Sequence, residues 1–328
     1  MPGRPLDVEL FAEDTRTRRD HFYSQLIDIL AELRQLEFQS AGALMPDPIG
    51  HDDPIVGPLL SIHINHLQKQ GVEVGSSKIF TRAVDFAFHQ LDVLAEYYQL
   101  PMSEQSLNTA QQEIFAQEHL KKELSKLVNA DWDTGPFVLC HMDLRWPNIL
   151  VDEELNILAV IDWEWAALIP RQLFTPPTWI AGREPQYVTS DEFRAEFSTF
   201  CEILNTKGAT TYGYGRLQEE WDSDMPNRIL PIAELLRHHS QLLSIFYQAL
   251  YPQLFTSPKQ EVVPRFLDQP ENTALASEAQ RRFQASKRYT DYLKENGLFV
   301  PDLDAAKARE LERMILELQE FNSRCYTD

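Results

Sequence analysis

Apolar residues in the N-terminal part of the chain recur three and four positions apart, which is typical of one face of an α-helix. The clearest pattern runs from Thr17 to Phe38, and further patterns run from Lys78 to Leu100 and from Glu104 to Asn129. The stretch from Ser40 to Pro58 is rich in Pro, Gly and Asp, which predicts a loop. Nothing before Pro136 predicts a β-sheet.

Short runs rich in Val, Ile and Leu begin at Pro136 and predict β-strands. They are PFVLC at 136–140, NILV at 148–151 and ILAVI at 157–161. The polar segment DEELN, which ends at Asn156, predicts a hairpin between the second and third strands. Helical spacing returns beyond Pro177, in residues 192–204, 229–249, 278–293 and 305–321. We therefore predict a mainly α-helical fold with a small β element.

Composition narrows the class of protein. A chain of 328 residues with 43% hydrophobic content can bury a sizeable core. Its formal net charge of −20 disfavours a nucleic-acid partner, because such binding needs clustered Lys and Arg. Cys140, Cys201 and Cys325 form no close pair, so neither a disulfide framework nor a CxxC zinc site is predicted. Because no apolar run suits a signal peptide or a membrane span, we expect a cytoplasmic protein without a membrane partner.

The strongest candidate for chemistry is the string HMDLRWPN at 141–148, which lies between the first two predicted strands. Phosphoryl transfer needs a carboxylate to orient the attacking hydroxyl and accept its proton, and oxygen ligands to hold a metal. Asp143 is the candidate for the first role, and Asn148 and Asp162 are the candidates for the second. We expect both carboxylates at one end of the same small sheet. His141 is expected to order the loop through hydrogen bonds.

A bland alternative is that Asp143 and Asp162 only cap strand ends as turn carboxylates. That alternative explains neither their spacing nor Asn148. A metal-dependent phosphohydrolase that uses His141, Asp143 and Asp162 is a weaker alternative, because it needs further His or Asp ligands that the sequence does not place.

The string at 141–148 and the later IDWE at 161–164 resemble the catalytic loop and metal-binding segment of the aminoglycoside phosphotransferase and choline kinase-like family, relatives of protein kinases. The usual family sequence is H-G-D-x-H-x-x-N, then a hairpin and I-D-W/F-E. Here Met142 replaces the usual Gly, and RWP at 145–147 replaces His-Pro-Gly. The Asp and Asn positions are retained, and the resemblance covers well over half of the chain.

The resemblance implies a protein-kinase-like C-lobe of α+β class, a helical bundle with short catalytic-loop strands and a hairpin. It implies an ATP-dependent kinase acting on a hydroxyl of a small molecule. Asp143 and His141 would be catalytic, and Asn148 and Asp162 would bind Mg²⁺ and the nucleotide. Within a single domain, 1–328, the implied parts are the end of the hinge at 1–14, a catalytic core at 15–180 and a helical substrate-side subdomain at 181–328.

The family's N-lobe supplies a loop over the phosphates, a strand Lys and its partner Glu, and none of these precedes the catalytic loop here. We therefore expect weakened ATP binding, impaired transfer and self-association through the exposed lobe interface. A non-catalytic kinase-like binding or scaffolding protein is the alternative. The segment from Gly71 to Ser77 is a weak candidate for a phosphate loop, because it lacks the G-x-G-x-x-G order.

Other candidates carry less weight. His63 and His66, three apart, could present two imidazoles to a metal, but no third ligand is visible. His238 and His239 are adjacent, which favours ordinary packing or surface roles. The acceptor molecule stays open, although the acidic composition weakly favours a cationic one. Three tryptophans are assigned to the core first and to a substrate pocket second: Trp163, Trp165 and Trp179.

Overall fold

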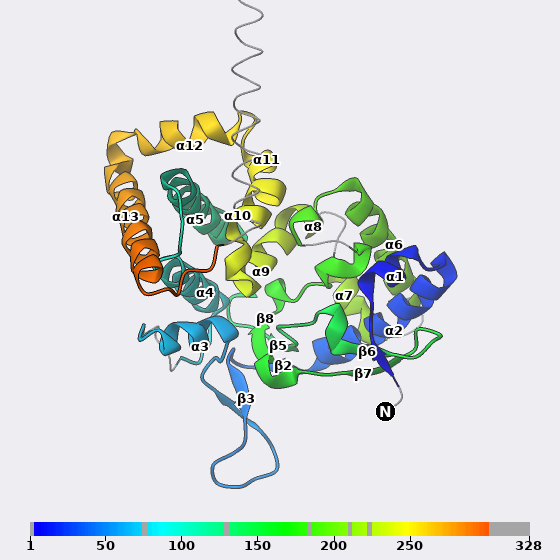
Figure 1. Ribbon diagram of the computed structural model, residues 1–328. Helices are drawn as coiled ribbons and strands as arrows, with labels where there is room; N and C mark the ends of the chain where they lie inside the picture. Colours follow the sequence, from blue (N-terminus) through cyan, green and yellow to red (C-terminus); the bar gives the residue numbers. More distant parts are fainter. Residues whose placement is uncertain are drawn as a thin grey trace, which may run out of the picture.

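The computed structural model describes residues 3–73, 78–127, 132–182, 185–208, 212–221 and 225–301. Helices make up most of this part of the chain, and the strands are short and antiparallel (Figure 1). The predicted mainly α-helical fold with a small β element is therefore confirmed. The pattern predicted at 305–321 lies outside the described residues.

The predicted strands after Pro136 are all present. β5 (Phe137–Cys140), β6 (Ile149–Val151) and β7 (Ile157–Val160) follow one another, and β6 and β7 form the predicted antiparallel hairpin. The turn between them is closed by Asp152, whose carboxylate accepts hydrogen bonds from the backbone and side chain of Asn156, each at 2.8 Å.

The expectation of one shared sheet for the two carboxylates is wrong. β6 lies between β1 (Arg4–Pro5) and β7, whereas β5 lies between β2 (Glu37–Phe38) and β8 (Ala167–Pro170) in a second sheet. The two strands that precede Asp143 and Asp162 therefore belong to different sheets. β5 and β7 are connected through the loop after β5 and the β6 strand, and they share no hydrogen-bonded ladder.

The expectation of no sheet before Pro136 is also wrong. Besides β1 and β2, the predicted loop contains the hairpin of β3 (Ala43–Met45) and β4 (Ile55–Gly57), which extends away from the body of the molecule (Figure 1). These strands are two or three residues long, too short for an alternating pattern to show. β1 and β2 also depend on partners more than 90 residues away in the chain, Leu150–Val151 and Phe137–Val138.

The N-terminal helices broadly follow the predicted ranges. α2 (Arg16–Gln35) buries Phe22, Leu26 and Leu30, which lie four residues apart. α4 (Ala83–Tyr97) begins later than expected, because Asp133 accepts hydrogen bonds from the backbone N–H groups of the first turn. The remaining helices of this part are α1 (Val8–Glu13), α3 (Ile62–Lys69) and α5 (Leu107–Leu127).

The predicted long helix at 229–249 is interrupted. α9 (Leu230–Arg237) ends where His238 leaves helical geometry, at φ −124° and ψ 70°. A 3-10 turn, α10 (Leu242–Ile245) and a π-helical turn at Phe246–Leu250 follow. The periodicity gave no sign of this break, which directs His238 and Gln241 towards a pocket while His239 stays buried.

The other C-terminal helices complete one core with the strands. α13 packs against α5 on one side of the molecule, with α12 near it, while α2 and α6 pack together on the other side (Figure 1). The largest cluster of buried apolar residues reaches from Leu6 to Leu267 and so includes both sides. The bounds are α6 (Asp191–Gly208), α7 (Gly215–Glu220), α8 (Met225–Arg228), α11 (Tyr251–Leu254), α12 (Lys259–Leu267) and α13 (Thr273–Glu295).

Candidate active site

The four residues predicted to carry chemistry lie in one connected network. His141 directly follows β5, and a 3-10 turn at Trp146–Asn148 ends the loop before β6. Asp162 follows β7 by one residue. The backbone N–H of Ile161 donates to the carbonyl oxygen of Asn148 at 2.9 Å, which fixes the segment of Asp162 against the end of the loop.

His141 joins the two sides of this network. Its Nε2 lies 2.8 Å from the carbonyl oxygen of Ile161, and its Nδ1 accepts the backbone N–H of Asp143 at 3.3 Å. A carbonyl oxygen can only accept and an amide N–H can only donate, so the pair of contacts requires the neutral ring with its proton on Nε2. The buried ring also contacts that of Trp163, with centroids 4.7 Å apart. These contacts agree with the predicted role of ordering the loop.

Asp143 is held by two neighbours. Its Oδ1 lies 2.8 Å from Nε of Arg145. Asn148 Nδ2 donates to the Asp143 carbonyl oxygen at 2.9 Å and is 3.3 Å from its Oδ2. Asn148 is only 3% exposed, so its amide has little freedom to turn away. The carboxylate, itself half-buried, is therefore presented at a fixed place in the loop.

Asp162 occupies an unusual backbone conformation. Its φ of 63° and ψ of 48° lie in the left-handed region, which L-residues other than Gly, Asn and Asp seldom adopt. Its side chain is exposed and makes no capping hydrogen bond to the 3-10 turn that it precedes. The strained backbone directs this carboxylate outward at the end of β7, where a ligand can reach it.

The donor set fits a magnesium ion with incomplete protein coordination. Asn148 and Asp162 would supply an amide and a carboxylate oxygen, and Mg²⁺ is usually held by one or two carboxylates together with waters and substrate phosphates. Within the described residues no group of three or more His, Cys, Asp and Glu side chains could hold a metal. A site in this protein would therefore depend on the nucleotide for its remaining ligands.

A pocket of about 440 Å³ opens beside the catalytic loop, and we distinguish two of its walls. The loop wall consists of the segment from Cys140 to Trp146 together with Trp165 and Trp179. The helical wall brings together the start of α3 with His63, Gln90 of α4, and the segment from Glu234 to Gln241. The volume is within the range of small-molecule sites.

Trp179 anchors the loop wall from behind. Its indole Nε1 donates to the carbonyl oxygen of Leu144 at 2.7 Å, and the side chain is buried. Trp165 is half-buried at the pocket, whereas Trp163 is 37% exposed and lies on His141. Two of the three tryptophans thus line the pocket, and Trp179 also belongs to the core as first assigned.

Charged groups on the helical wall are paired. The buried Glu234 accepts a hydrogen bond from Arg237 at 2.9 Å, and Nε2 of His238 lies 3.5 Å from its other oxygen. Arg237 also donates to Thr175 Oγ1 and to the carbonyl oxygen of Leu173. These contacts hold α9 on the segment that follows β8.

The predicted pair His63 and His66 shares a helical face, because both rings contact Tyr97. His63 also packs on His239, with ring centroids 4.1 Å apart. Burial and the neighbouring imidazoles lower the pKa of His63 to about 4, so the ring is neutral at pH 7. The contact between His63 and His239 is thus a packing contact. The described residues place no third metal ligand beside these histidines.

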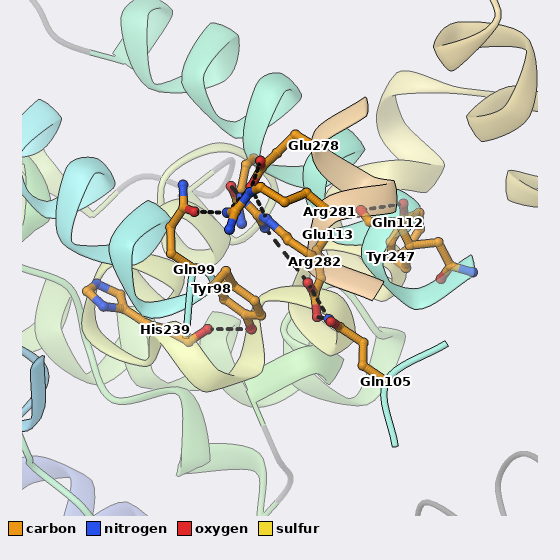
Figure 2. A network of polar contacts seen from close by, with 11 residues as sticks. Tyr98, Gln99, Gln105, Gln112, Glu113, His239, Tyr247, Glu278, Arg281 and Arg282 are labelled. Carbon is orange, nitrogen blue, oxygen red and sulfur yellow. Dashed lines mark hydrogen bonds and ion pairs between the residues drawn. The ribbon is translucent and has the colours of Figure 1, made fainter. Parts of the chain in front are cut away.

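A polar network lies behind the helical wall, between α5 and α13 (Figure 2). Glu113 is buried, accepts two hydrogen bonds from Gln105 at 2.8 Å, and lies 3.9 Å from Arg282. Burial raises the pKa of Glu113 to about 7 despite these partners. Tyr98 donates to the carbonyl oxygen of His239 at 2.9 Å and so connects α4 to the turn that carries His238.

Sequence reasoning missed three of the residues that line the helical wall: Gln90, Glu234 and Arg237. Gln90 lies four residues from Phe86 and four from Leu94 on the buried face of α4. A glutamine on an otherwise apolar stripe is a signal that could have been noticed. Glu234 and Arg237 offered no such signal, because charged residues three apart on a helix usually face solvent.

The sequence model of the phosphotransferase enzyme family matches residues 1–172, slightly more than half of the chain. The chain belongs to this family, the aminoglycoside phosphotransferase and choline kinase-like phosphotransferases. Searches of curated proteins and of solved structures found no match. In the described part of the chain, none of the helices combines the length and apolar character needed to span a membrane.

Proposed function

We propose that this protein transfers the γ-phosphoryl group of ATP to a hydroxyl of a small molecule, using a protein-kinase-like C-lobe. The observation that carries the proposal is the network in which Asn148 contacts Asp143 and, through Ile161, the segment of Asp162. Asp143 lines the pocket and would be the proton acceptor, and Asn148 and Asp162 would supply two oxygen ligands beside it. Membership of the phosphotransferase family supports the same chemistry.

In the proposed reaction the acceptor hydroxyl lies in the pocket and donates a hydrogen bond to Asp143. The hydroxyl oxygen bonds to the γ-phosphorus, the bond from that phosphorus to the β–γ bridging oxygen breaks, and the proton passes to Asp143. Asn148 and Asp162 would hold Mg²⁺, which when bound neutralises charge on the phosphates. His141 keeps the loop and the Asp162 segment in register and does not itself exchange a proton.

The test is phosphoryl transfer from Mg-ATP to a panel of small alcohols, with ADP release and product phosphate both measured. Asp143→Asn should lower the rate by about 10³-fold, because the amide cannot accept the proton. Exposed Asp53 provides the control, Asp53→Asn, which should retain full activity. Equal rates for the wild type and Asp143→Asn would contradict the proposal. A folded wild type without turnover on every alcohol would favour a non-catalytic binding protein.

A further inference from the structure

The carboxylates and guanidinium groups on the pocket walls neutralise one another. Asp143 pairs with Arg145 at 2.8 Å on the loop wall, and Glu234 pairs with Arg237 at 2.9 Å on the helical wall. The overall charge of the chain is −20, yet the pocket holds no excess of carboxylates among these four groups. The global charge therefore attracts cations to the surface in general, but the described residues that line the pocket offer them no unpaired carboxylate.

Histidines do not change this balance in favour of a cation. His63 lines the pocket and is neutral at pH 7, because burial and the neighbouring imidazoles lower its pKa to about 4. His238 faces Glu234 at 3.5 Å, so the carboxylate of that wall lies between Arg237 and an imidazole. Among the described residues of the two walls, a ligand with a positive charge would thus meet no unpaired negative charge.

Unpaired hydrogen-bond acceptors do remain on the helical wall. The carbonyl oxygens of the Gln90 and Gln241 side chains have no hydrogen-bond partner among the described residues, and both residues line the pocket. Gln90 is only 2% exposed. A buried acceptor without a donor costs about 1–3 kcal/mol, so a ligand that supplies the missing donor gains from binding there.

We propose that the acceptor is a neutral polyhydroxylated molecule of the sugar or polyol class, and that Gln90 binds a hydroxyl other than the one that reacts. Such a molecule supplies several donors without charge, and its C–H faces can pack on the half-buried indole of Trp165 in the loop wall. Gln90 is then a specificity-determining residue on the helical wall. This inference rests on the proposed function for the reacting hydroxyl, but its claim of binding can be tested without nucleotide or turnover.

The test measures binding without nucleotide, by calorimetry at pH 6.5, for neutral compounds and their amino analogues. The probe pairs are glucose with glucosamine, galactose with galactosamine, and glycerol with 2-amino-1,3-propanediol. We expect at least one neutral member to bind about tenfold more tightly than its ammonium analogue. Tighter or equal binding of the amines, or no binding of any neutral member, would overturn the inference.

Variants of Gln90 locate the contact. Gln90→Leu should weaken binding of the neutral compound about tenfold, which corresponds to one lost hydrogen bond of about 1.4 kcal/mol. Gln90→Glu should retain that binding better and shift preference towards the amine, a gain that loss of folding cannot produce. Gln172→Leu is the matched control, since Gln172 is also buried with an unpartnered carbonyl oxygen but lines a different pocket.

The outcomes separate this inference from the proposed function. If a neutral polyol binds in a way that depends on Gln90 but is not phosphorylated by Mg-ATP, the inference holds and the proposed function is contradicted. Phosphorylation that depends on Asp143 but shows unchanged affinity in Gln90→Leu would do the reverse. Unaltered melting temperatures of the variants would show that the differences arise in the pocket.

Discussion

The two walls of the pocket differ in how the chain builds them. The network that orders the loop wall lies in one continuous stretch from His141 to Asp162, and its hydrogen bonds join residues no more than 20 positions apart. His63, Gln90 and Glu234 of the helical wall come from three helices far apart in the sequence. The comparison teaches that the groups proposed for catalysis are encoded locally, while the surface proposed to select the acceptor exists only after the helices pack.

Breaking the network that orders the loop wall should have the larger effect on activity. Asn148→Ala removes both hydrogen bonds to Asp143 and one proposed metal ligand, so we expect kcat/KM to fall by about 10²–10³-fold. Steady-state kinetics with Mg-ATP measure this change.

Asn156→Ala is the control, because Asn156 orders the nearby hairpin turn through Asp152 without touching the catalytic loop. It should lower stability by about 1 kcal/mol and leave the activity of the folded protein unchanged. Similar losses of activity in the two variants would show that the loop contacts are only structural.

The stability of the folded protein should depend on pH through Glu113, which lies behind the helical wall. Burial raises its pKa in the folded protein to about 7 from the ordinary value of 4.5, so between these pH values the folded protein holds a proton that the unfolded chain releases. The associated stability is complete below 4.5 and is lost as pH rises through about 7, a fall on the order of 3 kcal/mol. Denaturant unfolding at pH 5 and pH 8 should show it.

Glu113→Gln keeps an acceptor for Gln105 and removes the titration, so its stability should fall less between the two pH values. The difference between wild type and variant isolates the contribution of Glu113 to the pH dependence from that of the buried histidines. The stability that neutral buried histidines contribute is lost as pH falls, the opposite direction. Burial lowers the pKa values of His239 and His63, so these residues lower the stability of the folded protein at acid pH. An equal pH dependence in both proteins would exclude Glu113 as its source.

The same contrast explains what the sequence could predict. β5, β6 and β7 were visible because Val, Ile and Leu gather in short runs, and α2 was visible because Phe22, Leu26 and Leu30 share one face. The break at His238 was not visible, because it is stabilised from outside by Tyr98 and not by a local Gly or Pro. β1 and β2 likewise exist through partners supplied by the fold.

Within the candidate site, the sequence predicted His141, Asp143, Asn148 and Asp162, and the structure brings the segments that carry them together. The sequence prediction placed the two carboxylates at one end of a single sheet, whereas β5 and β7 belong to two sheets. The hydrogen bonds of His141 and Asn148 across the loop maintain the convergence that a shared sheet would have given. Charge pairing in the pocket was beyond the sequence, because composition sums charges without placing them.

The most direct test of the proposed function is a calorimetric titration of the protein with Mg-ATP, compared with Asp162→Asn. Asparagine tolerates the left-handed backbone of this position, so the variant removes charge without adding strain. Asp268→Asn, on an exposed carboxylate after α12, is the control. The account predicts binding that weakens at least about tenfold in Asp162→Asn and is unchanged in Asp268→Asn. Absence of Mg-ATP binding, or equal affinity in all three proteins, would contradict it.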